Sequence, residues 1–248
     1  MSTTRTTVVT GGTRGIGAAI ARRVAASGGR VAAVYRDGAQ AAERFAEAAL
    51  ADGLDISVHR ADISSVPECR RLVRTVVEER GPVGALVNNA GVLTEAKVAE
   101  VTEEEWDRTL TTNLKSAFFL AQAVWPHLIA DGAGRVVNIG SVTATSGNPV
   151  EAAYASSKAG LIGLTRSLAL AGARKGVTVN AVMPGVYETD MTAGMPEDTQ
   201  RRIAALIPVG RRGRPEELAH IVQALLHPDA GYITGAVIMA DGGLGMGM

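Results

Sequence analysis

Short runs of apolar, β-branched residues alternate along the whole chain with longer segments rich in alanine. The runs are continuously apolar, which is typical of strands buried on both faces of a parallel sheet. Predicted strands cover residues 7–10, 30–35, 56–60, 85–88, 135–139, 177–182 and 236–240. Predicted helices cover residues 15–27, 39–51, 66–80, 103–128 and 153–173. Because repeated strand–helix units need right-handed crossovers, the sequence predicts a doubly wound α/β fold with helices on both faces of the sheet.

The composition of the chain limits the kinds of molecule that it can be expected to bind. Of the 248 residues, 46% are hydrophobic and 4% aromatic, so the chain can bury a substantial, mainly aliphatic core. The 25 basic residues balance the 25 acidic ones, which leaves no overall basic field for nucleic acid. The single cysteine, Cys69, cannot form a disulfide within the chain. No apolar segment approaches the roughly 20 residues that span a membrane, and the polar N-terminus does not resemble a secretory signal. We therefore expect a cytoplasmic protein that binds neither nucleic acid nor membrane.

A glycine-rich turn follows the first predicted strand. Its glycines, Gly11, Gly15 and Gly17, have the spacing G-x-x-x-G-x-G, which differs from the G-x-G-x-x-G dinucleotide fingerprint. The physical logic is shared, because glycines let the backbone approach a pyrophosphate while the next helix presents its N-terminus to the negative charge. The pattern favours nucleotide binding, and the alternative is a strand-to-helix turn without a ligand.

The end of the second predicted strand favours NADP over NAD. An acidic residue there would hold the ribose 2′-hydroxyl of NAD, but this strand ends in Tyr35 and Arg36. Arg14, in the glycine-rich turn, can approach the same ribose, and two guanidiniums suit a 2′-phosphate. Two alternatives stay open. Asp37 would favour NAD if the register slipped by two residues, and Arg36 would be a solvated loop charge if it met no cofactor.

Two further strand ends carry candidate cofactor contacts. Asp62 and Ile63 follow the third strand, where a carboxylate can accept a hydrogen bond from the adenine amino group. Asn88, Asn89, Ala90 and Gly91 follow the fourth strand, where small residues and a turn let the backbone lie against a cofactor. The alternative for Asn88 is that it ties neighbouring strands together.

A candidate acid–base group lies in the second half of the chain. Ser141 follows the fifth predicted strand, and Tyr154 and Lys158 are four residues apart, so they share one face of a helix. The pKa of a phenol is ~10, and we expect the Lys158 ammonium to lower the pKa of Tyr154. Ser141 can donate to a substrate carbonyl, and Lys158 can hold nicotinamide ribose hydroxyls. These residues favour hydride transfer to a carbonyl, with Tyr154 delivering the proton.

Each of these residues also has an ordinary explanation. The pattern Tyr-x-x-x-Lys is common on half-exposed helix faces, and a serine after a strand is often a turn residue. Asn113, inside the predicted helix 103–128, would then be a polar surface position.

Taken in order, the residues resemble the short-chain dehydrogenase/reductase family. The resemblance extends from Thr10 to Gly243 and rests on the glycine-rich turn, residues 88–91, Asn113, Ser141, Tyr154-x-x-x-Lys158 and Pro184-Gly185. It implies a Rossmann-type fold of about seven parallel strands and a catalytic tetrad of Asn113, Ser141, Tyr154 and Lys158. It also implies that Asn113 opens a helix kink whose free carbonyl holds a water, which links Lys158 to solvent. The expected cofactor-binding residues are Gly11, Thr13, Arg14, Gly15, Ile16, Gly17, Arg36, Asp62, Ile63, Asn89, Tyr154, Lys158, Tyr187 and Thr189, with no metal site.

Within that family, several stretches are similar to 3-oxoacyl-[acyl-carrier-protein] reductases. They are residues 13–17, 159–163, 184–191, 207–211 and 232–235. The chain departs from the pattern at Leu93-Thr94-Glu95, where Thr-Arg-Asp is usual. It also carries Gly132 and Lys175 at two positions where the family pattern has arginine. Candidates for receiving an acidic carrier protein are Arg174, Lys175, Arg135, Arg201, Arg202, Arg211, Arg212 and Arg214.

The resemblance implies an NADPH-dependent reductase of a 3-oxoacyl thioester, linked to acyl carrier protein or coenzyme A. The alternatives are an NADP-dependent dehydrogenase of a free alcohol, sugar or cyclic ketone, and a cofactor-binding regulator without turnover. We expect a single domain over residues 1–248, with a cofactor half at about 1–112 and a catalytic and substrate half at about 113–248. Residues 187–214 are expected to form a substrate loop, as a mobile loop or short helices. A homotetramer with two-fold interfaces is also expected.

Overall fold

Seven parallel strands form the sheet at the centre of the computed structural model, which describes residues 5–189, 194 and 196–247. The strands are β1 (Thr6–Thr10), β2 (Arg30–Tyr35), β3 (Ile56–Arg60), β4 (Val83–Asn88), β5 (Arg135–Ile139), β6 (Thr178–Pro184) and β7 (Val237–Ala240). Their spatial order is β3-β2-β1-β4-β5-β6-β7. The predicted Rossmann-type parallel sheet is confirmed, and each strand end lies within about two residues of its predicted position.

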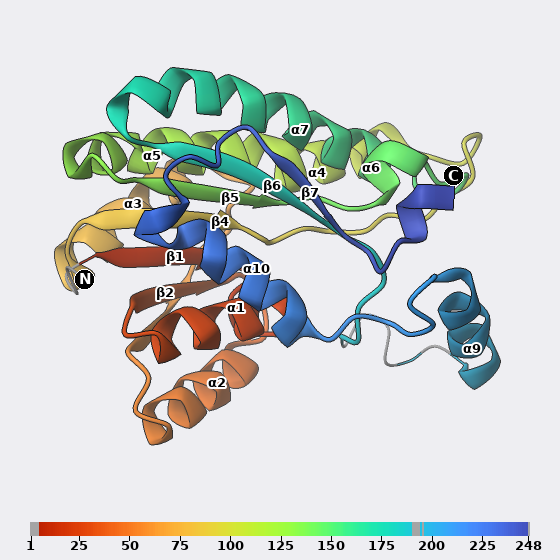
Figure 1. Ribbon diagram of the computed structural model, residues 1–248, viewed down its shortest axis with the longest axis horizontal. Coiled ribbons are helices and arrows are strands. Elements are labelled where there is room, and N and C mark those ends of the chain that lie inside the picture. Colours follow the sequence, from red (N-terminus) through yellow and green to blue (C-terminus); the bar gives the residue numbers. More distant parts are fainter. Residues whose placement is uncertain (1–4, 190–193, 195, 248) are drawn as a thin grey trace.

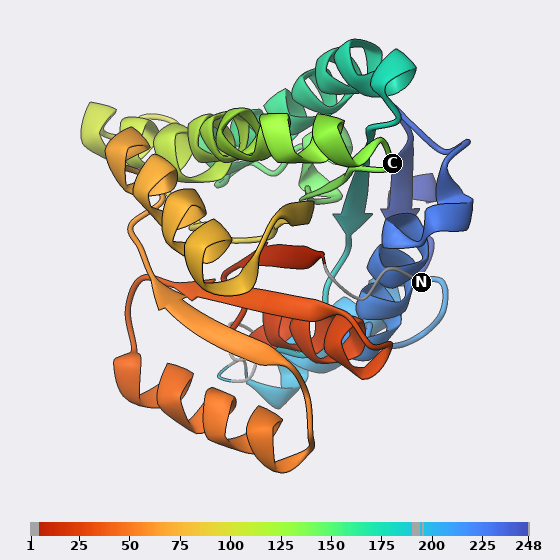
Figure 2. The ribbon, with the colours of Figure 1, turned by 90° about the vertical axis from the view of Figure 1, so that its left-hand side faces the viewer.

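Helices cover both faces of this sheet (Figures 1 and 2). One face carries α1 (Gly15–Ala26), α2 (Ala39–Ala51) and α10 (Pro215–Leu226). The other face carries α3 (Val66–Arg80), α5 (Ser116–Asp131) and α7 (Ala152–Gly172). The short helices are α4 (Glu103–Leu110), α6 (Thr143–Ser146), α9 (Glu197–Leu206), the π-helical turn η1 (Thr111–Lys115) and the 3₁₀ turns η2 (Ala173–Lys175), η3 (Pro228–Ala230) and η4 (Leu244–Gly247). Over the described ranges, no helix has both the length and the hydropathy needed to cross a bilayer.

The core consists of two aliphatic clusters, one on each face of the sheet. Leu72 of α3 and Leu120 of α5 belong to the first cluster, and Ile20 of α1 and Leu218 of α10 belong to the second. Successive strand residues alternate between them: Val8 packs into the first cluster and Val9 into the second. Because both faces are covered, both sets of strand positions must be apolar, which explains the continuous runs in the sequence.

The strand order reverses between β1 and β4. From β1 the chain continues outward to β2 and β3, whereas β4 lies on the other side of β1 and leads outward to β5, β6 and β7. Connections that leave in opposite directions open a crevice at the carboxyl ends of these two strands, which is where ligands bind in open α/β sheets. The glycine-rich turn follows β1, and Asn89 follows β4, so both lie at this crevice.

The helix predicted over residues 103–128 is present, but its hydrogen bonding is not uniform. The structure divides this segment into α4, the π-helical turn η1 and α5. A capping box formed by Thr102 and Glu105 begins α4, and Asn113 lies in the middle of η1. The side chain of Asn113 bonds the backbone of a neighbouring loop, and this tertiary contact accompanies the local widening of the helix.

The sequence analysis also missed α10. This helix begins after Arg214, which is not one of the usual N-cap residues, but Pro215 at its first position and the acidic Glu216 and Glu217 are common start signals. Leu218, Val222 and Leu225 are buried with the spacing of one helix face, and that periodicity is a further signal that could have found it. The predicted substrate loop 187–214 contains α9, which stands out from the two helical layers (Figure 1). Residues 190–193 and 195 of that loop lie outside the described residues.

Candidate active site

The glycine-rich turn is built from close backbone contacts. Gly11 and Gly15 have positive φ angles of 61° and 51°, a region that glycine adopts without strain. A Cβ on Gly17 would lie 2.0 Å from the carbonyl oxygen of Gly11 and 2.6 Å from Nδ2 of Asn89. The turn can therefore keep this shape only with glycine at these positions, and its backbone is open to a ligand.

Asn89 and Thr10 fix this turn to the end of β4. Nδ2 of Asn89 donates to the carbonyl oxygens of Thr10 and Gly11 at 2.9 and 3.3 Å. Oγ1 of Thr10 accepts from the backbone N–H groups of Asn89 and Ala90, both at 3.0 Å. The Asn89 side chain thus positions the turn, while the predicted tie between strands belongs to Asn88. Its Nδ2 donates to Oδ1 of Asn138 at 2.8 Å.

The N-terminus of α1 has the features of an anion site. Its N-cap, Arg14, makes no side-chain cap, and the first turn contains no acidic residue. The free N–H groups of this turn therefore keep their capacity to bind a negative charge such as a pyrophosphate. Thr13 is half-buried in the turn, and Ile16 packs against the apolar cluster of this face. The side chain of Thr189 would lie 3.6 Å from a Cβ on Gly15, which brings the segment after β6 to the same turn.

The carboxyl ends of β2 and β3, where the adenosine end of the cofactor is expected in the crevice, are polar and charged. Arg36 is exposed, and its Nε donates to Oδ2 of Asp37 at 2.7 Å. Oδ1 of Asp62 accepts from the backbone N–H and the hydroxyl of Ser64 at 3.0 and 2.7 Å, which lowers the pKa of Asp62. Ile63 is buried. Arg14 is exposed as well, so both predicted guanidiniums are accessible to a ligand.

Ser141 and Tyr154 meet at the carboxyl end of β5. The Ser141 hydroxyl lies close enough to the Tyr154 phenol to lower its pKa. Oγ of Ser141 in turn accepts from the backbone N–H and the hydroxyl of Thr143, at 3.2 and 2.9 Å. The first turn of α6 thereby fixes the Ser141 rotamer. Sequence reasoning missed Thr143, although a hydroxyl two residues after a strand-end serine is a recognisable turn pattern.

Lys158 reaches the same place from one helical turn further along α7. Its side chain is 4% exposed, and its Nζ donates to the carbonyl oxygen of Ile139 at 2.9 Å. The ammonium lies 5.6 Å from the centre of the Tyr154 ring. Burial lowers the pKa of Lys158 to about 8. A Cβ on Gly91 would lie 3.4 Å from this Nζ and 3.2 Å from Oδ1 of Asn113, so the backbone at Gly91 passes close to both side chains.

Asn113 joins three elements behind Lys158. Its Oδ1 accepts from the N–H of Val92 at 2.8 Å, and its Nδ2 donates to the carbonyl of Val92 at 2.9 Å. The same Nδ2 donates to Oγ of Ser157 at 3.1 Å, and Ser157 donates to the carbonyl of Tyr154 at 2.7 Å. Asn113 is therefore a buried connector and not the polar surface residue of the alternative explanation. Ser157 was missed, and only its place between Tyr154 and Lys158 hinted at it.

The expected lowering of the Tyr154 pKa is not observed. Burial raises the pKa of Tyr154 to about 12, the Ser141 hydrogen bond lowers it, and the negative charge of Glu151 raises it further. Lys158 does not offset the burial, because its Nζ bonds Ile139 and contacts only the ring face. Glu151 was also missed: it is buried, and its Oε1 accepts from Nδ2 of Asn148 at 2.7 Å. A phenol with a high pKa stays protonated at neutral pH and can act as an acid.

Known proteins match almost the whole chain. A family model described as enoyl-(acyl carrier protein) reductase matches residues 11–245. Acetoacetyl-CoA reductase of Rhizobium meliloti is 42% identical over 240 residues, covering 96% of this chain and 98% of the relative. The 3-oxoacyl-[acyl-carrier-protein] reductase of Escherichia coli is 40% identical over 241 residues and 96% of each chain. A crystal structure of an actinorhodin polyketide ketoreductase variant with NADPH superposes with a TM-score of 0.92 at 37% identity, over 98% of this chain and 97% of that one.

The chain belongs to the short-chain dehydrogenase/reductase family. This short-chain dehydrogenase/reductase is an oxidoreductase acting on CH–OH groups, and it uses a nicotinamide cofactor. Among the residues that the structure describes, no three His, Cys, Asp or Glu side chains gather as a metal site.

Tyr187, which was expected to contact the cofactor, has its hydroxyl engaged by the protein backbone in this short-chain dehydrogenase/reductase. It is buried, and its hydroxyl donates to the carbonyl of Ala240 at 2.9 Å. Its ring lies against Gly213, where a Cβ would come within 2.6 Å of the ring. Tyr187 therefore joins the segment after β6 to β7, and its neighbour Thr189 is the residue that reaches the glycine-rich turn.

Several residues that were expected to receive an acidic carrier protein are buried or lie far from the active site. Arg135 is 4% exposed, and its guanidinium donates to backbone carbonyls including those of Gly134 and Pro228, so it cannot receive a partner. Arg174 and Lys175 lie in η2, after the last turn of α7, whereas Tyr154 lies in the first turn. A helix of 21 residues is about 30 Å long, so within one chain these two residues do not flank the site.

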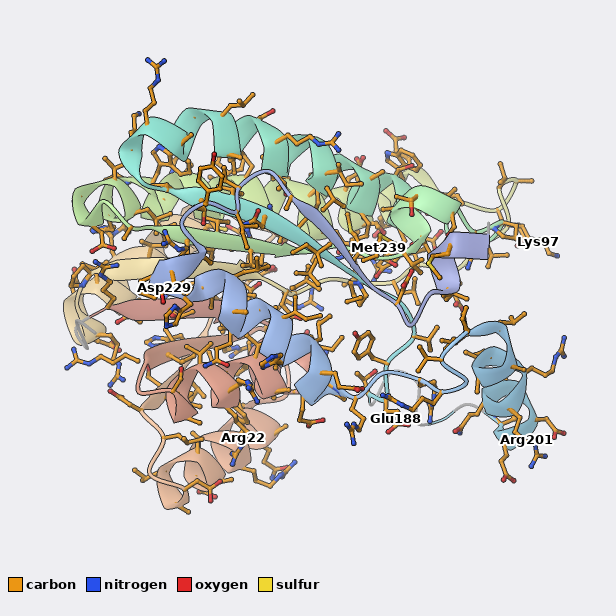
Figure 3. The ribbon with its side chains drawn as sticks, viewed as in Figure 1. Arg22, Lys97, Glu188, Arg201, Asp229 and Met239 are labelled. Atoms are coloured by element: carbon orange, nitrogen blue, oxygen red, sulfur yellow. The ribbon has the colours of Figure 1, made fainter. Side chains whose placement is uncertain are left out.

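The arginines of the substrate loop are largely paired with nearby carboxylates. Arg201 on α9 pairs with Glu197 and Asp198, and Figure 3 shows it on the outer part of that helix. Arg211 makes two hydrogen bonds with Glu217, at 2.7 and 2.8 Å. These pairs are intrahelical or local, so they leave the surface near the site with little net positive charge for an acidic partner.

Proposed function

We propose that this chain is an NADPH-dependent reductase that converts 3-oxoacyl thioesters to the 3-hydroxyacyl form. The observation that carries the proposal is the convergence of the Ser141 hydroxyl, the Tyr154 phenol and the Lys158 ammonium at the carboxyl end of β5. These groups supply a hydrogen-bond donor, a proton and a positive charge to one place. A carbonyl oxygen that gains negative charge during reduction needs all three.

Each residue of the site has a separate role in the proposed reaction. NADPH, when bound, supplies the hydride that forms the new C–H bond at C3. Ser141 orients the ketone oxygen, and Tyr154 donates its phenolic proton to that oxygen as the C–O double bond becomes single. Lys158 stabilises the phenolate that Tyr154 leaves, and it holds the nicotinamide ribose. Asn113 keeps η1 open, so that a backbone carbonyl there can hold the water through which the proton is replaced.

The cofactor contacts support NADPH as the reductant. The uncapped N-terminus of α1 and the open glycine-rich turn fit a pyrophosphate. Arg14 and Arg36 are both exposed, and two guanidiniums suit a 2′-phosphate. Asp62 has one carboxylate oxygen committed to Ser64, which leaves the other for the adenine amino group.

The relatives and the charge around the site support this substrate class. Both acetoacetyl-CoA reductase and 3-oxoacyl-[acyl-carrier-protein] reductase resemble this chain at about 40% identity. Because Arg135 is buried and Arg174 and Lys175 lie at the far end of α7, one chain offers little to an acidic carrier protein. We therefore expect the carrier-bound form to be favoured only modestly over the coenzyme A form.

A substrate panel tests the proposal. The purified protein is assayed with NADPH against acetoacetyl-CoA, a carrier-bound 3-oxoacyl chain, and free ketones, sugars and cyclic ketones. Reduction of both thioesters with a higher kcat/KM than any free ketone is the expected result. Turnover of a free ketone or alcohol without any thioester reduction would assign the chain to dehydrogenases of free substrates. Absence of NADPH oxidation with every substrate would indicate a cofactor-binding regulator.

A further inference from the structure

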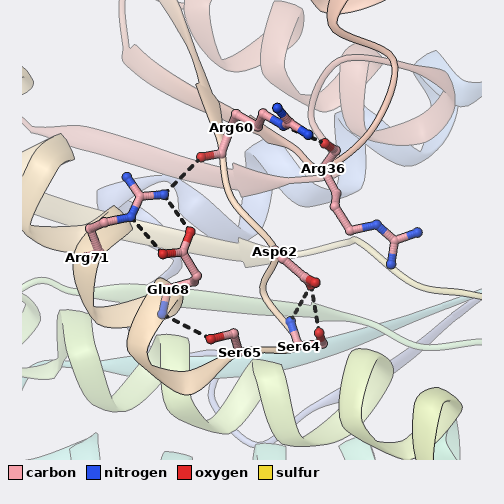
Figure 4. A network of polar contacts seen from close by, with 7 residues as sticks. All are labelled: Arg36, Arg60, Asp62, Ser64, Ser65, Glu68 and Arg71. Atoms are coloured by element: carbon pink, nitrogen blue, oxygen red, sulfur yellow. Dashed lines mark hydrogen bonds and ion pairs between the residues drawn. The ribbon is translucent and has the colours of Figure 1, made fainter.

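An open depression lies at the carboxyl ends of β2 and β3, beside the adenosine end of the crevice. It is lined by Arg36, Asp37, Arg60, Ala61, Asp62, Glu68 and Arg71. Figure 4 shows the polar contacts in this region, which connect the end of β2 to the first turns of α3. Three arginines therefore line one surface hollow, and only Arg36 among them was predicted from the sequence to contact the cofactor.

The sheet register places Arg60 next to the end of β2, where the adenosine ribose is expected to bind. Arg60 is the last residue of β3 and pairs with Tyr35, the last residue of β2. Its Nε donates to the carbonyl oxygen of Arg36 at 3.2 Å. The end of β2 is where a 2′-hydroxyl or 2′-phosphate of the adenosine ribose meets the protein. The Arg60 guanidinium is therefore hydrogen-bonded to the backbone of Arg36, the residue that directly follows β2.

The three guanidiniums differ in how their charge is compensated. Arg36 is paired with Asp37 at 2.7 Å. Arg71 is paired with Glu68 through two hydrogen bonds of 2.6 and 2.9 Å, and it also donates to the carbonyl of Arg60 at 3.3 Å. Within the described part of the chain, the terminal nitrogens of Arg60 have neither an ion pair nor a hydrogen bond. Its only partner is a neutral carbonyl.

This difference matters for an anionic ligand. A phosphate that approaches Arg36 or Arg71 must compete with a carboxylate that already holds the guanidinium. A phosphate that approaches Arg60 meets an uncompensated charge with four N–H donors still available, and its Nε contact restrains the side chain beforehand. The anchoring of the Arg60 carbonyl by Arg71 adds rigidity to the end of β3.

We propose that Arg60 is a specificity-determining residue that binds the 2′-phosphate of the cofactor together with Arg36. The inference deepens the proposed NADPH dependence and rests on it. Arg60 supplies the larger share of the preference for a 2′-phosphate, because Arg36 must first give up Asp37. Asp37 acts in the opposite sense, since it lowers the net charge that the phosphate meets.

Ligand binding tests this assignment without relying on turnover. Calorimetry measures the binding of adenosine 2′,5′-bisphosphate, which carries the 2′-phosphate, and of AMP, which lacks it. The variants are Arg60→Met, Arg36→Met and the matched control Arg70→Met, which removes an exposed charge from α3 outside the depression. The ratio of kcat/KM for NADPH and NADH is measured on the same proteins, and thermal melting shows that each variant is folded.

The expected result is that Arg60→Met lowers bisphosphate affinity about tenfold or more, the size of one charge-assisted hydrogen bond, and leaves AMP affinity unchanged. The NADPH-to-NADH ratio falls by a similar factor, Arg36→Met has a smaller effect, and Arg70→Met has none. If Arg60→Met behaves like Arg70→Met while the wild type prefers NADPH, the role of Arg60 is overturned and the proposed function stands. If the wild type itself binds AMP and the bisphosphate equally, the NADPH assignment and this inference both fail.

Discussion

Burial shifts the two ionisable groups of the site in opposite directions. It raises the pKa of Tyr154 to about 12 and lowers the pKa of Lys158 to about 8, because in each case the charged form loses hydration. The neutral phenol is thereby kept ready to donate a proton. The ammonium is held at a pKa where it is still mostly protonated at neutral pH.

The residues of this site were predictable, but their ionisation was not. The i, i+4 spacing of Tyr154 and Lys158 places them on one helix face, and that follows from the sequence. The sign of the Tyr154 shift depends on how deeply the ring is buried and on Glu151, which lies in the turn before it. Both depend on the packing of the whole chain, which local spacing does not report.

The titration of Lys158 should be visible in the stability of the cofactor-free protein. Its pKa is about 8 in the folded state and about 10.5 in the unfolded chain, so between these values the unfolded state binds more protons. The Lys158 contribution to the free energy of unfolding therefore rises with pH over this window. Tyr154, whose pKa is raised, contributes in the opposite direction only above pH 10.

We predict that the stability of the wild type relative to Lys158→Met increases between pH 7 and pH 10. Urea unfolding of both proteins at several pH values measures this difference, in which the Tyr154 contribution cancels. Parallel pH curves for the two proteins would show that Lys158 titrates at its ordinary pKa and is not desolvated as the structure indicates.

At the scale of elements, the interrupted helix α4–η1–α5 positions the site. The polar residue Asn113 inside an otherwise helical segment was visible in the sequence, but its partner Val92 is 21 residues away. Helix propensity alone predicts one continuous helix, because the contact that accompanies η1 is tertiary. The helix α10 differs, because Pro215 at its first position, the acidic residues of its first turn and its regular buried face were all visible in the sequence.

Asn113→Ala should destabilise the protein, because it leaves the N–H and carbonyl of Val92 and the hydroxyl of Ser157 without this partner. Unsatisfied buried polar groups cost about 1–3 kcal/mol each, so we predict a loss of at least about 2 kcal/mol in urea unfolding. The matched control is Thr112→Val in the same turn. Oγ1 of Thr112 is buried and has no hydrogen-bond partner within the described chain, so its removal should be neutral or stabilising. Equal losses for the two variants would contradict the connecting role of Asn113.

At the scale of the whole molecule, the alternation of strands and helices predicted the fold because it runs through the entire chain. Interfaces between copies of the chain were harder to predict from the sequence than the fold. The exposed large hydrophobic side chains include Phe118 and Leu170 on the helices of one face, and Tyr232 and Met239 near the last strand. Exposed apolar side chains in two separate regions fit two different interfaces between copies.

We predict that the protein is a homotetramer with two-fold interfaces. Light scattering at micromolar concentration should give four times the mass of the chain. Leu170→Glu and Tyr232→Glu, which place charges in the two regions, should each yield smaller species. A monomeric wild type under these conditions would reject the prediction.

The central claim is that Tyr154 delivers the proton to a ketone oxygen. The most direct test compares the wild type with Tyr154→Phe, which removes the hydroxyl and keeps the buried ring, in NADPH-dependent reduction of acetoacetyl-CoA. We predict that kcat falls at least ~100-fold, the usual contribution of a general acid, while the Kd for NADPH stays nearly unchanged. A variant that binds NADPH and retains a kcat close to that of the wild type would contradict the account.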